Sequence, residues 1–207
     1  MSDTQEGQTT LRPKRGPLTY ALWGVALIGA AAALYVTVHL FIKPAGAADL
    51  QSLAKGQMHN LTLASAGQPL PTTPFVDGNG HPLHLSDLKG KLMVVNLWAT
   101  WCGPCVTEMP SLAKLQAAYP GKILVVPISM DKTPDREKAR AFMAMHAPLP
   151  FYEDEQSAME FALVPPAQGF PTTIIYDATG HERARVTDGA DWSGPDAHAV
   201  FDALLKG

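Results

Sequence analysis

Cysteine is almost absent from this chain, because the 207 residues include only Cys102 and Cys105, three positions apart. One close pair excludes a framework of several disulfide bridges, and it also excludes a zinc site built from four cysteine thiolates. The chain therefore has one local dithiol, and any thiol chemistry depends on these two residues.

Long runs of basic residues are also absent. Residues 1–43 hold four Lys and Arg residues against two acidic ones, whereas residues 44–207 hold 12 basic residues against 17 acidic ones, a net charge of −5. Proteins that bind the phosphate backbone of nucleic acids carry a basic stripe or patch. We therefore expect no nucleic-acid partner.

Formal charge is missing from residues 18–42, an apolar run of 25 residues. This length is sufficient for a tilted helix to cross a hydrocarbon core of ~30 Å. Three basic residues precede the run and only Lys43 follows it closely, so the positive-inside rule keeps the tail, residues 1–17, in the cytoplasm. The sequence predicts one transmembrane helix, a signal anchor of the cell inner membrane, with the later residues in the periplasm.

A cleaved secretory signal peptide is the alternative, because Ala45, Gly46 and Ala47 fit a small-x-small cleavage pattern. The apolar run is longer than the ~7 to 15 residues of a signal peptide's apolar region, which favours the uncleaved anchor. Both interpretations export the dithiol to an oxidising compartment.

Residues 43–73 are rich in Ala, Gly, Gln, Pro and Thr and lack a sustained apolar period. This composition predicts an extracytoplasmic linker. The folded domain is expected at residues 74–207, which are enough for a single hydrophobic core.

Strand and helix patterns alternate through this domain, which indicates an α/β fold. Residues 75–85 predict a β-hairpin with its turn at residues 77–80. A last helix is expected from Ser193, where the S-G-P-D sequence offers a capping box. The other expected strands are residues 92–99, 123–129, 172–177 and 181–188, and the other expected helices are residues 104–119, 135–145 and 157–163.

The motif Trp-Cys-Gly-Pro-Cys, residues 101–105, stands between a buried strand and a helix, a context typical of a redox pair. Cys102 is expected at the helix N-terminus, where free amide groups and the helix dipole stabilise a thiolate, so its pKa should fall below the ~8.5 of free cysteine. Cys102 is the predicted nucleophile. Cys105, one turn into the helix, is the predicted resolving thiol that attacks the mixed disulfide.

A metal site is the main alternative for this pair. Two thiolates are half of a tetrahedral zinc site, and His81 and His84 could supply the other half. These histidines lie in the predicted hairpin, where turn or cross-strand roles are commoner. A copper site at Met143, Met145 and His146 is disfavoured, because positions i and i+2 of a helix do not share a face. We expect neither a metal nor another cofactor, only the redox-active disulfide.

Two segments carry a family resemblance: NLWATWCGPCVTEMP at residues 96–110 and GFPTT at residues 169–173. They resemble the thioredoxin superfamily, in particular the membrane-anchored TlpA/ResA-like thiol-disulfide oxidoreductases, and the anchor and linker are most similar to TlpA. The resemblance spans residues 74–207. It implies a thioredoxin-like fold, a central mixed sheet flanked by helices with an N-terminal β-hairpin, preceded by the transmembrane helix.

The resemblance also implies roles for individual residues. Pro171 should form a cis peptide bond against the dithiol, and Phe170 should offer its backbone to an extended substrate strand. Pro110 corresponds to the family's helix-kinking proline, whose missing N–H argues for the same bend. The residues expected to contact the substrate are Trp101, Gly103, Pro104, Phe170 and Pro171.

The proton acceptor is expected to differ from that of cytoplasmic thioredoxin. Thioredoxin has a buried aspartate where this chain has Asn96, which cannot accept a proton. Glu108 lies three residues after Cys105 on the same helix face, and ResA-like relatives place an active-site glutamate there. We expect Glu108 to exchange a proton with Cys105, whereas a solvated surface position is the alternative. Trp98 is expected to pack in the core.

The Gly103-Pro104 dipeptide of thioredoxin favours a reductase, with a potential nearer about −270 mV than the roughly −120 mV of strong oxidants. The resemblance implies clients with cysteine pairs, namely copper-assembly factors and the copper-carrying oxidase subunit, with apocytochrome c as the alternative. It also implies a membrane electron donor of the CcdA/DsbD type. The alternatives to a reductase are a metal-binding chaperone module that uses the Cys-x-x-Cys motif and an oxidase or isomerase.

Overall fold

The computed structural model describes residues 47–63 and 65–206, together with Gly29. The expected anchor, residues 18–42, therefore lies outside the described residues apart from that glycine. None of the helices within the described ranges is both long and apolar enough to span a bilayer. The unit described below falls within Pro44–Gly207.

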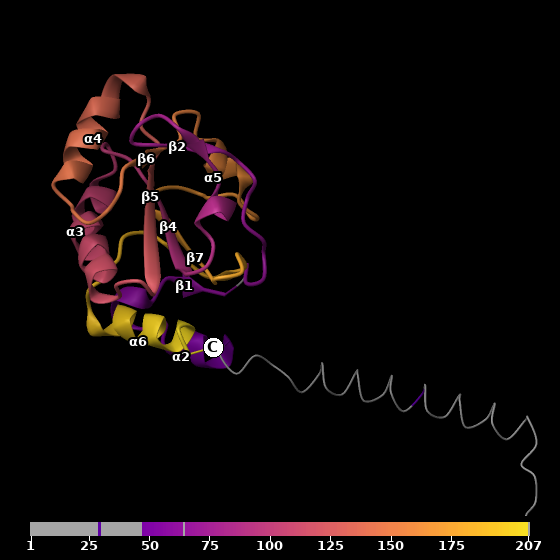
Figure 1. Cartoon of the computed structure of the whole chain (residues 1–207). Coiled ribbons are helices and arrows are strands. Elements are labelled where there is room, and N and C mark those ends of the chain that lie inside the picture. The colour runs from indigo at the N-terminus through magenta and orange to yellow at the C-terminus, as the bar shows by residue number, and fades with distance from the viewer. Residues whose placement is uncertain (1–28, 30–46, 64, 207) are drawn as a thin grey trace, which may run out of the picture. The chain divides into compact units, whose positions relative to one another are not determined.

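An eight-stranded mixed sheet forms the centre of this unit (Figure 1). Its strand order is β1-β8-β7-β4-β5-β6-β2-β3. The pairs β4–β5 and β5–β6 are parallel, and the other pairs are antiparallel. The strands are β1 (Leu61–Thr62), β2 (Phe75–Asp77), β3 (Pro82–Leu83), β4 (Leu92–Trp98), β5 (Ile123–Ser129), β6 (Tyr152–Glu153), β7 (Thr172–Tyr176) and β8 (Glu182–Thr187).

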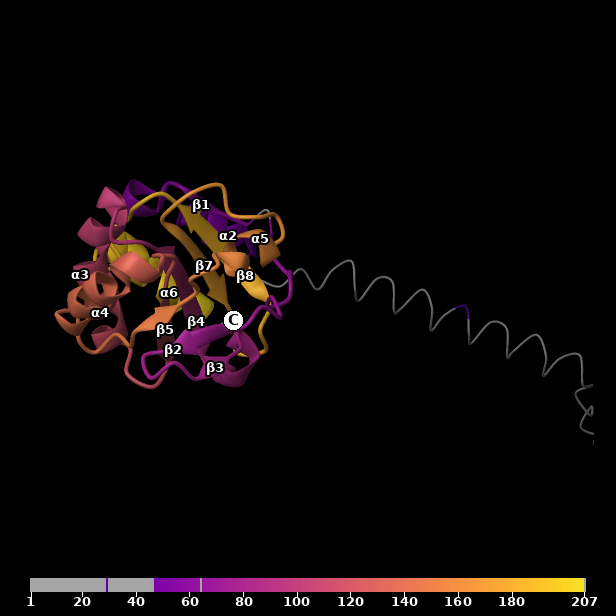
Figure 2. The same ribbon diagram turned by 90° about the horizontal axis from the view of Figure 1, so that it is seen from above.

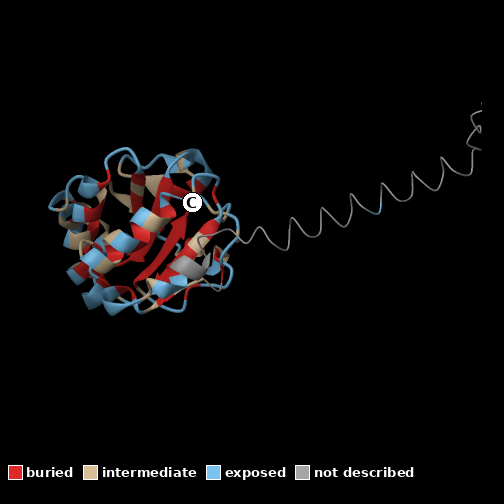
Figure 3. Cartoon of the chain, turned by 90° about the horizontal axis from the view of Figure 1, so that it is seen from below, coloured by how far each residue is buried: buried red, intermediate tan, exposed pale blue. Residues whose placement is uncertain are grey.

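Helices cover both faces of the sheet, so its central strands are buried on both sides, as Figures 2 and 3 show. All seven residues of β4 are buried, which explains why the sequence of this strand is a nearly continuous apolar run. The helices are α2 (Ala47–Ser52), α3 (Gly103–Ala118), α4 (Arg136–Ala144), α5 (Ala158–Ala162) and α6 (Pro195–Leu204), with short 3₁₀ helices at Gly56–Met58, Leu85–Leu88 and Thr133–Asp135.

Alternate residues of β4 face two different apolar clusters. Val94 and Trp98 belong to the cluster that contains the buried faces of α3, α4 and α6. Val95 and Leu97 belong to the other cluster, which contains Met159 of α5. This alternation places Asn96, between Val95 and Leu97, on the face that α3 covers.

Most of the predicted elements are confirmed. The hairpin pairs β2 with β3 around a turn at residues 77–80, and the strands and helices expected in residues 92–188 are present within a few residues of their predicted ends. The predicted mixed sheet, with its N-terminal hairpin, is therefore confirmed. Strand β6, which joins the hairpin to β5, was not predicted, because two residues are too few to show a period.

The start of the last helix was predicted wrongly. Gly194, and not Ser193, is the N-cap of α6, and Pro195 opens the helix. The Ser193 hydroxyl donates a hydrogen bond to Asp191 Oδ1 at 2.8 Å, so it closes a local turn instead of capping the helix.

The folded part also begins before Pro74, where the sequence placed its start. Leu50, Met58 and Leu61 are at most 3% exposed and belong to the same apolar cluster as α3 and α6. Strand β1 pairs with β8, with Leu61 opposite Val186. The predicted linker, residues 43–73, is therefore part of the folded domain from residue 47 onward. The sequence did not show this, because the apolar residues of the segment are too few to form a recognisable period.

We expect Met58→Ala to lower the free energy of unfolding by about 2–5 kcal/mol, because it removes a fully buried side chain. Exposed Gln51→Ala in the same segment is the matched control and should change it by less than about 0.5 kcal/mol. Urea unfolding measures both values. Equal, small effects would mean that this segment does not contribute to the core.

Candidate functional site

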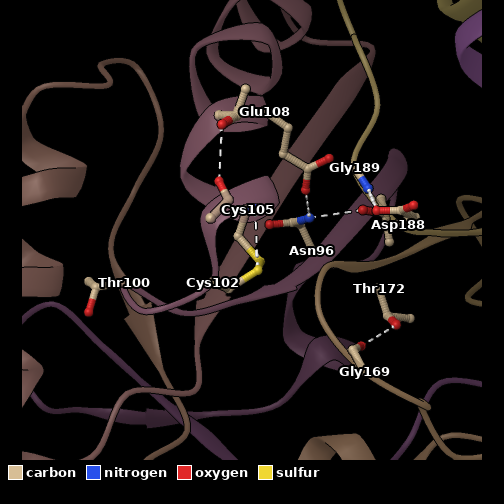
Figure 4. The surroundings of a disulfide bond; sticks show 12 residues. Asn96, Thr100, Cys102, Cys105, Glu108, Gly169, Thr172, Asp188 and Gly189 are labelled. Carbon is tan, nitrogen blue, oxygen red and sulfur yellow. Dashed lines mark hydrogen bonds between the residues drawn. A yellow bond between two sulfur atoms is a disulfide. The ribbon is translucent and has the colours of Figure 1, made fainter.

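The dithiol lies where β4 ends and α3 begins. Cys102 is the N-cap of α3, and its Sγ accepts a hydrogen bond from the Cys105 backbone N–H at 3.3 Å. Pro104 stands in the first turn, where its missing N–H leaves no bond unmade. Cys102 and Cys105 are joined by a disulfide, with their Cα atoms 5.3 Å apart (Figure 4). The predicted position of Cys102 at the helix N-terminus is confirmed.

The two sulfur-bearing residues differ in their access to solvent. Cys102 is 6% exposed and Cys105 is 0% exposed. Cys102 is thus the less enclosed of the two residues, whereas the roles of nucleophile for Cys102 and resolving thiol for Cys105 stay predictions. The low pKa expected for Cys102 stays a prediction.

Asp131 binds Thr100 in the loop before the dithiol, and this contact was not predicted from the sequence. Its carboxylate accepts hydrogen bonds from the Thr100 backbone N–H at 2.9 Å and from the Thr100 hydroxyl at 2.7 Å. Ser129 donates a further bond to it at 2.8 Å. Asp131 follows β5, the parallel neighbour of β4, and the carboxyl ends of parallel strands meet at one sheet edge. That placement was a signal available in the sequence.

The expected substrate-contacting residues surround the exposed side of the site. The Phe170–Pro171 peptide bond is cis, as the resemblance implied. Trp101 is 62% exposed, and its ring and that of Phe170 make an edge-to-face contact with centroids 5.7 Å apart. Gly103 and Pro104 are exposed in the first turn of α3.

The segment after β8 connects the cis-proline loop with the dithiol helix. The Asp188 backbone N–H donates to the Pro171 carbonyl at 3.1 Å. A Cβ atom on the next residue, Gly189, would lie 3.3 Å from the Pro104 side chain, tighter than ordinary contact. Residues 188–189 therefore hold the Pro171 loop and the start of α3 side by side.

Glu108 is buried beside the dithiol and is not a surface carboxylate. It is 3% exposed. Its Oε1 accepts a hydrogen bond from Asn96 Nδ2 at 2.8 Å, and its Oε2 accepts from Trp192 Nε1 at 2.9 Å and from the Ala190 backbone N–H at 3.1 Å. The role of Trp192 and Ala190 was not predicted, because they lie more than 80 positions away in the sequence.

Two opposing effects set the proton affinity of Glu108. Burial removes the carboxylate from water and raises its pKa, and the nearby charge of Asp188 acts in the same direction, so that the net pKa is about 7 and not the ordinary 4.5. The hydrogen bonds from Trp192, Ala190 and Asn96 act in the opposite direction, because all three groups donate to the charged form. A pKa near neutrality suits a group that accepts a proton and returns it.

Glu108 also lines a pocket of about 570 Å³ on the flank of α3. Lys114, Asp188 and Asp191 lie around the same pocket, whereas neither cysteine belongs to its lining. The carboxyl group therefore has a route to solvent that does not pass the sulfur atoms.

The alternative metal ligands of the hairpin have structural partners. His81 Nδ1 lies 3.3 Å from Asp77 Oδ2, and His84 Nδ1 lies 3.8 Å from Asp87 Oδ2 at the start of a 3₁₀ helix. Strand β3, which ends one residue before His84, lies four places from β4 in the sheet. Among the described residues, no group of three or more His, Cys, Asp or Glu side chains is placed to hold a metal ion.

The two remaining predictions concern packing. Trp98 is fully buried, and its ring lies 5.3 Å from that of Phe142, so its predicted role in the core is confirmed. Pro110 lies inside α3, which continues to Ala118, whereas the kink expected there stays a prediction.

Comparison with known proteins adds to this geometry. A family model described as Redoxin matches residues 65–198. The thioredoxin-like protein YneN of Bacillus subtilis (strain 168) is 35% identical over 116 residues, which cover 55% of this chain and 66% of YneN, just under two thirds of its length. The thiol-disulfide oxidoreductase ResA of Geobacillus kaustophilus is 30% identical over 129 residues, which cover 61% of this chain and 71% of ResA.

Among solved structures, the thioredoxin domain of a thiol-disulfide oxidoreductase from Bacteroides vulgatus aligns with a TM-score of 0.55 at 23% identity. The alignment covers 70% of this chain and 99% of that domain. This likeness shows that the fold is thioredoxin-like.

The raised pKa of Glu108 has a consequence for stability. The folded state binds this proton more tightly than the unfolded chain, so the free energy of unfolding should fall as the pH rises from 4.5 to about 7, by up to about 3 kcal/mol. Glu108→Gln should remove this slope, because glutamine does not titrate. Urea unfolding across this pH range measures the slope.

The matched control for this prediction is Glu137→Gln on α4, a surface glutamate whose side chain is 82% exposed. It should leave the slope unchanged. The prediction is wrong when Glu108→Gln and the unchanged chain lose stability equally over the range.

Proposed function

The chain belongs to the Redoxin family, and we propose that it is a protein-disulfide reductase for clients with cysteine pairs. One observation carries this proposal: a reachable sulfur and an enclosed sulfur form a pair at the start of α3, beside a buried carboxyl group. The relatives ResA and YneN are named as a thiol-disulfide oxidoreductase and a thioredoxin-like protein, which supports the same chemistry.

The proposed reaction begins with the reduced pair. The Cys102 thiolate attacks one sulfur of a client disulfide, so a mixed disulfide forms and the other client sulfur leaves as a thiolate. Cys105 then loses its proton, its thiolate attacks Cys102 Sγ, and the second client sulfur leaves. The client gains two electrons, and its two thiolates take up two protons, one matched by the proton that Cys105 releases and one from solvent. Cys102 and Cys105 lose two electrons and become the disulfide.

Glu108 serves the second step of this reaction. Cys105 is enclosed, so its proton has no direct path to bulk water. The Glu108 carboxylate is on the same helix one turn later and has a pKa of about 7, so near neutral pH it can accept the proton that Cys105 must lose. The flanking pocket then returns that proton to solvent.

The exposed aromatic side of the site is the proposed client-binding surface. Trp101 and Phe170 border Cys102 there, and the cis-Pro171 loop can present the Phe170 backbone to an extended client segment. A cysteine pair in a flexible or extended segment meets these requirements. The residues proposed to contact the client are Trp101, Gly103, Pro104, Phe170 and Pro171.

The Gly103-Pro104 dipeptide supports reduction as the direction of the reaction. The uncharged run at residues 18–42, with basic residues before it, supports an anchor in the inner membrane and a periplasmic domain. A reductase in an oxidising compartment must be re-reduced, so we propose a dithiol-carrying membrane donor of the CcdA/DsbD type. The proposed clients are copper-assembly factors and the copper-carrying oxidase subunit, with apocytochrome c as the alternative.

The direct test of this function is Cys105→Ser in the whole protein. The first step should proceed and the second should stop, so the client should accumulate as a mixed disulfide on Cys102, and its identification names the client. Cys102→Ser is the matched control and should capture nothing. The absence of any mixed disulfide with Cys105→Ser would contradict the proposal.

A second test concerns proton transfer. We expect Glu108→Gln to slow the release of a bound client about a hundredfold near neutral pH, because the proton acceptor of Cys105 is lost. The inflection of the rate near pH 7 should also disappear. Stopped-flow measurement of client release across pH gives both values. Glu137→Gln should behave as the unchanged protein, and an inflection that persists in Glu108→Gln would show that another group accepts the proton.

A further inference from the structure

The Asn96 side chain has one hydrogen-bonding atom without a partner. Asn96 is 0% exposed, and its Oδ1 makes no hydrogen bond although it is fully enclosed. Buried polar atoms are nearly always paired, so an exception in a redox site calls for an explanation. The oxidised pair carries no S–H group that could donate to this oxygen.

The orientation of this amide is determined by its neighbours. Both hydrogens of Nδ2 are used, one donated to Glu108 Oε1 at 2.8 Å and the other to Thr173 Oγ1 at 2.8 Å. Rotation of the amide by half a turn would direct Oδ1 at the Glu108 carboxylate, where two acceptors repel each other. Charged Glu108 therefore keeps Oδ1 pointing away from itself.

The free oxygen lies on the side of the dithiol. Asn96 stands on the face of β4 that α3 covers, and its strand neighbour Trp98 shares an apolar cluster with Cys105. Its amide binds Glu108, one helical turn after Cys105. Figure 4 shows the amide nitrogen directed at Glu108 and the amide oxygen directed toward the cysteine pair.

We propose that Asn96 Oδ1 accepts a hydrogen bond from the Cys105 thiol when the pair is reduced. This inference rests on the proposed function, because that function requires the reduced pair. Reduction breaks the S–S bond and adds two electrons and two protons, supplied by the dithiol donor described above, so Cys105 Sγ gains the S–H group that Oδ1 lacks. One amide then holds the resolving thiol with its oxygen and the proton acceptor with its nitrogen.

This bond should favour the neutral thiol over the thiolate of Cys105, because it stabilises only the protonated form. Cys105 therefore stays protonated until the mixed disulfide forms, which prevents it from competing with Cys102 as a nucleophile. The charged groups that face Glu108 around its pocket are Lys114, Asp188 and Asp191, and Glu108 is the only one of these four residues bonded to the amide.

The test uses the whole protein with Cys102→Ser, in which Cys105 is the sole thiol. The ultraviolet absorbance of the thiolate, measured across pH, gives the pKa of Cys105. Asn96→Ala should raise the thiolate fraction at a given pH roughly tenfold, about the effect of one lost hydrogen bond. Asn96→Asp should lower it, because the new carboxyl group keeps an acceptor there and brings the negative charge that it shares with Glu108 closer to the sulfur.

Two controls separate this role from a structural one. Thr173→Val removes the other partner of the amide and should change the thiolate fraction by less than about twofold, because Oδ1 stays in place. Asn96→Ala should still raise the fraction in a Glu108→Gln background. The proposal is overturned when Asn96→Ala leaves the thiolate fraction unchanged in the Glu108→Gln background, since Asn96 then acts only through Glu108. It is also overturned when Asn96→Ala and Asn96→Asp shift the thiolate fraction in the same direction.

The remaining outcomes are also decisive. Where far-ultraviolet circular dichroism shows that Asn96→Ala is unfolded, Asn96→Asp decides: a lowered thiolate fraction supports the proposal, and an unchanged one overturns it. Reduction of a disulfide-bonded model peptide by the unchanged protein tests the proposed function separately. An active protein without the shift contradicts only the role of Asn96, whereas an inactive protein with the shift contradicts only the function.

Discussion

Glu108 is the group around which the site is organised. A buried carboxylate has lost its hydration shell, so it requires donors from the protein in place of water. These donors come from Asn96 of β4 and from Ala190 and Trp192 in the segment after β8. The helix, the strand and that segment must therefore lie together before the charge is accommodated, and this requirement fixes α3 against the sheet. The dithiol occupies the first turn of the same helix, so it is held as well.

The loop on the other side of the dithiol is fixed by a second carboxylate. Asp131, at the carboxyl end of β5, binds the backbone and the hydroxyl of Thr100, two residues before Cys102. Both carboxylates are buried, but they act on different parts of the motif: Asp131 orders the approach to the helix, and Glu108 orders its second turn. Between these two anchored points Trp101, Gly103 and Pro104 are exposed, which suits the client contacts proposed above.

The sequence allows the local parts of this site to be predicted and leaves its long-range parts undetermined. The strand, the dithiol turn and the helix are predicted by the periodic spacing of apolar residues and by the Cys-x-x-Cys motif. Cys105 and Glu108 are predicted to share a helix face because they are three residues apart. By contrast, Trp192 reaches Glu108 across 84 positions of sequence, and no local pattern encodes such a contact. The packing of Met58 was missed for a similar reason, because isolated apolar residues show no period.

The amide of Asn96 in β4 leaves Glu108 in α3 as the only titrating group of this hydrogen-bonded pair. Two carboxylates within 2.8 Å of each other could not both ionise, so an aspartate in place of Asn96 would share one proton with Glu108. Asn96 avoids this conflict, because it donates to the carboxylate and presents a neutral oxygen on its other side. The single titrating group of this pair then lines the pocket of Lys114 and Asp188, and Trp101 does not belong to that lining. The proposed proton route through this pocket and the proposed client surface at Trp101 and Phe170 therefore share Pro104 alone among the residues named for them.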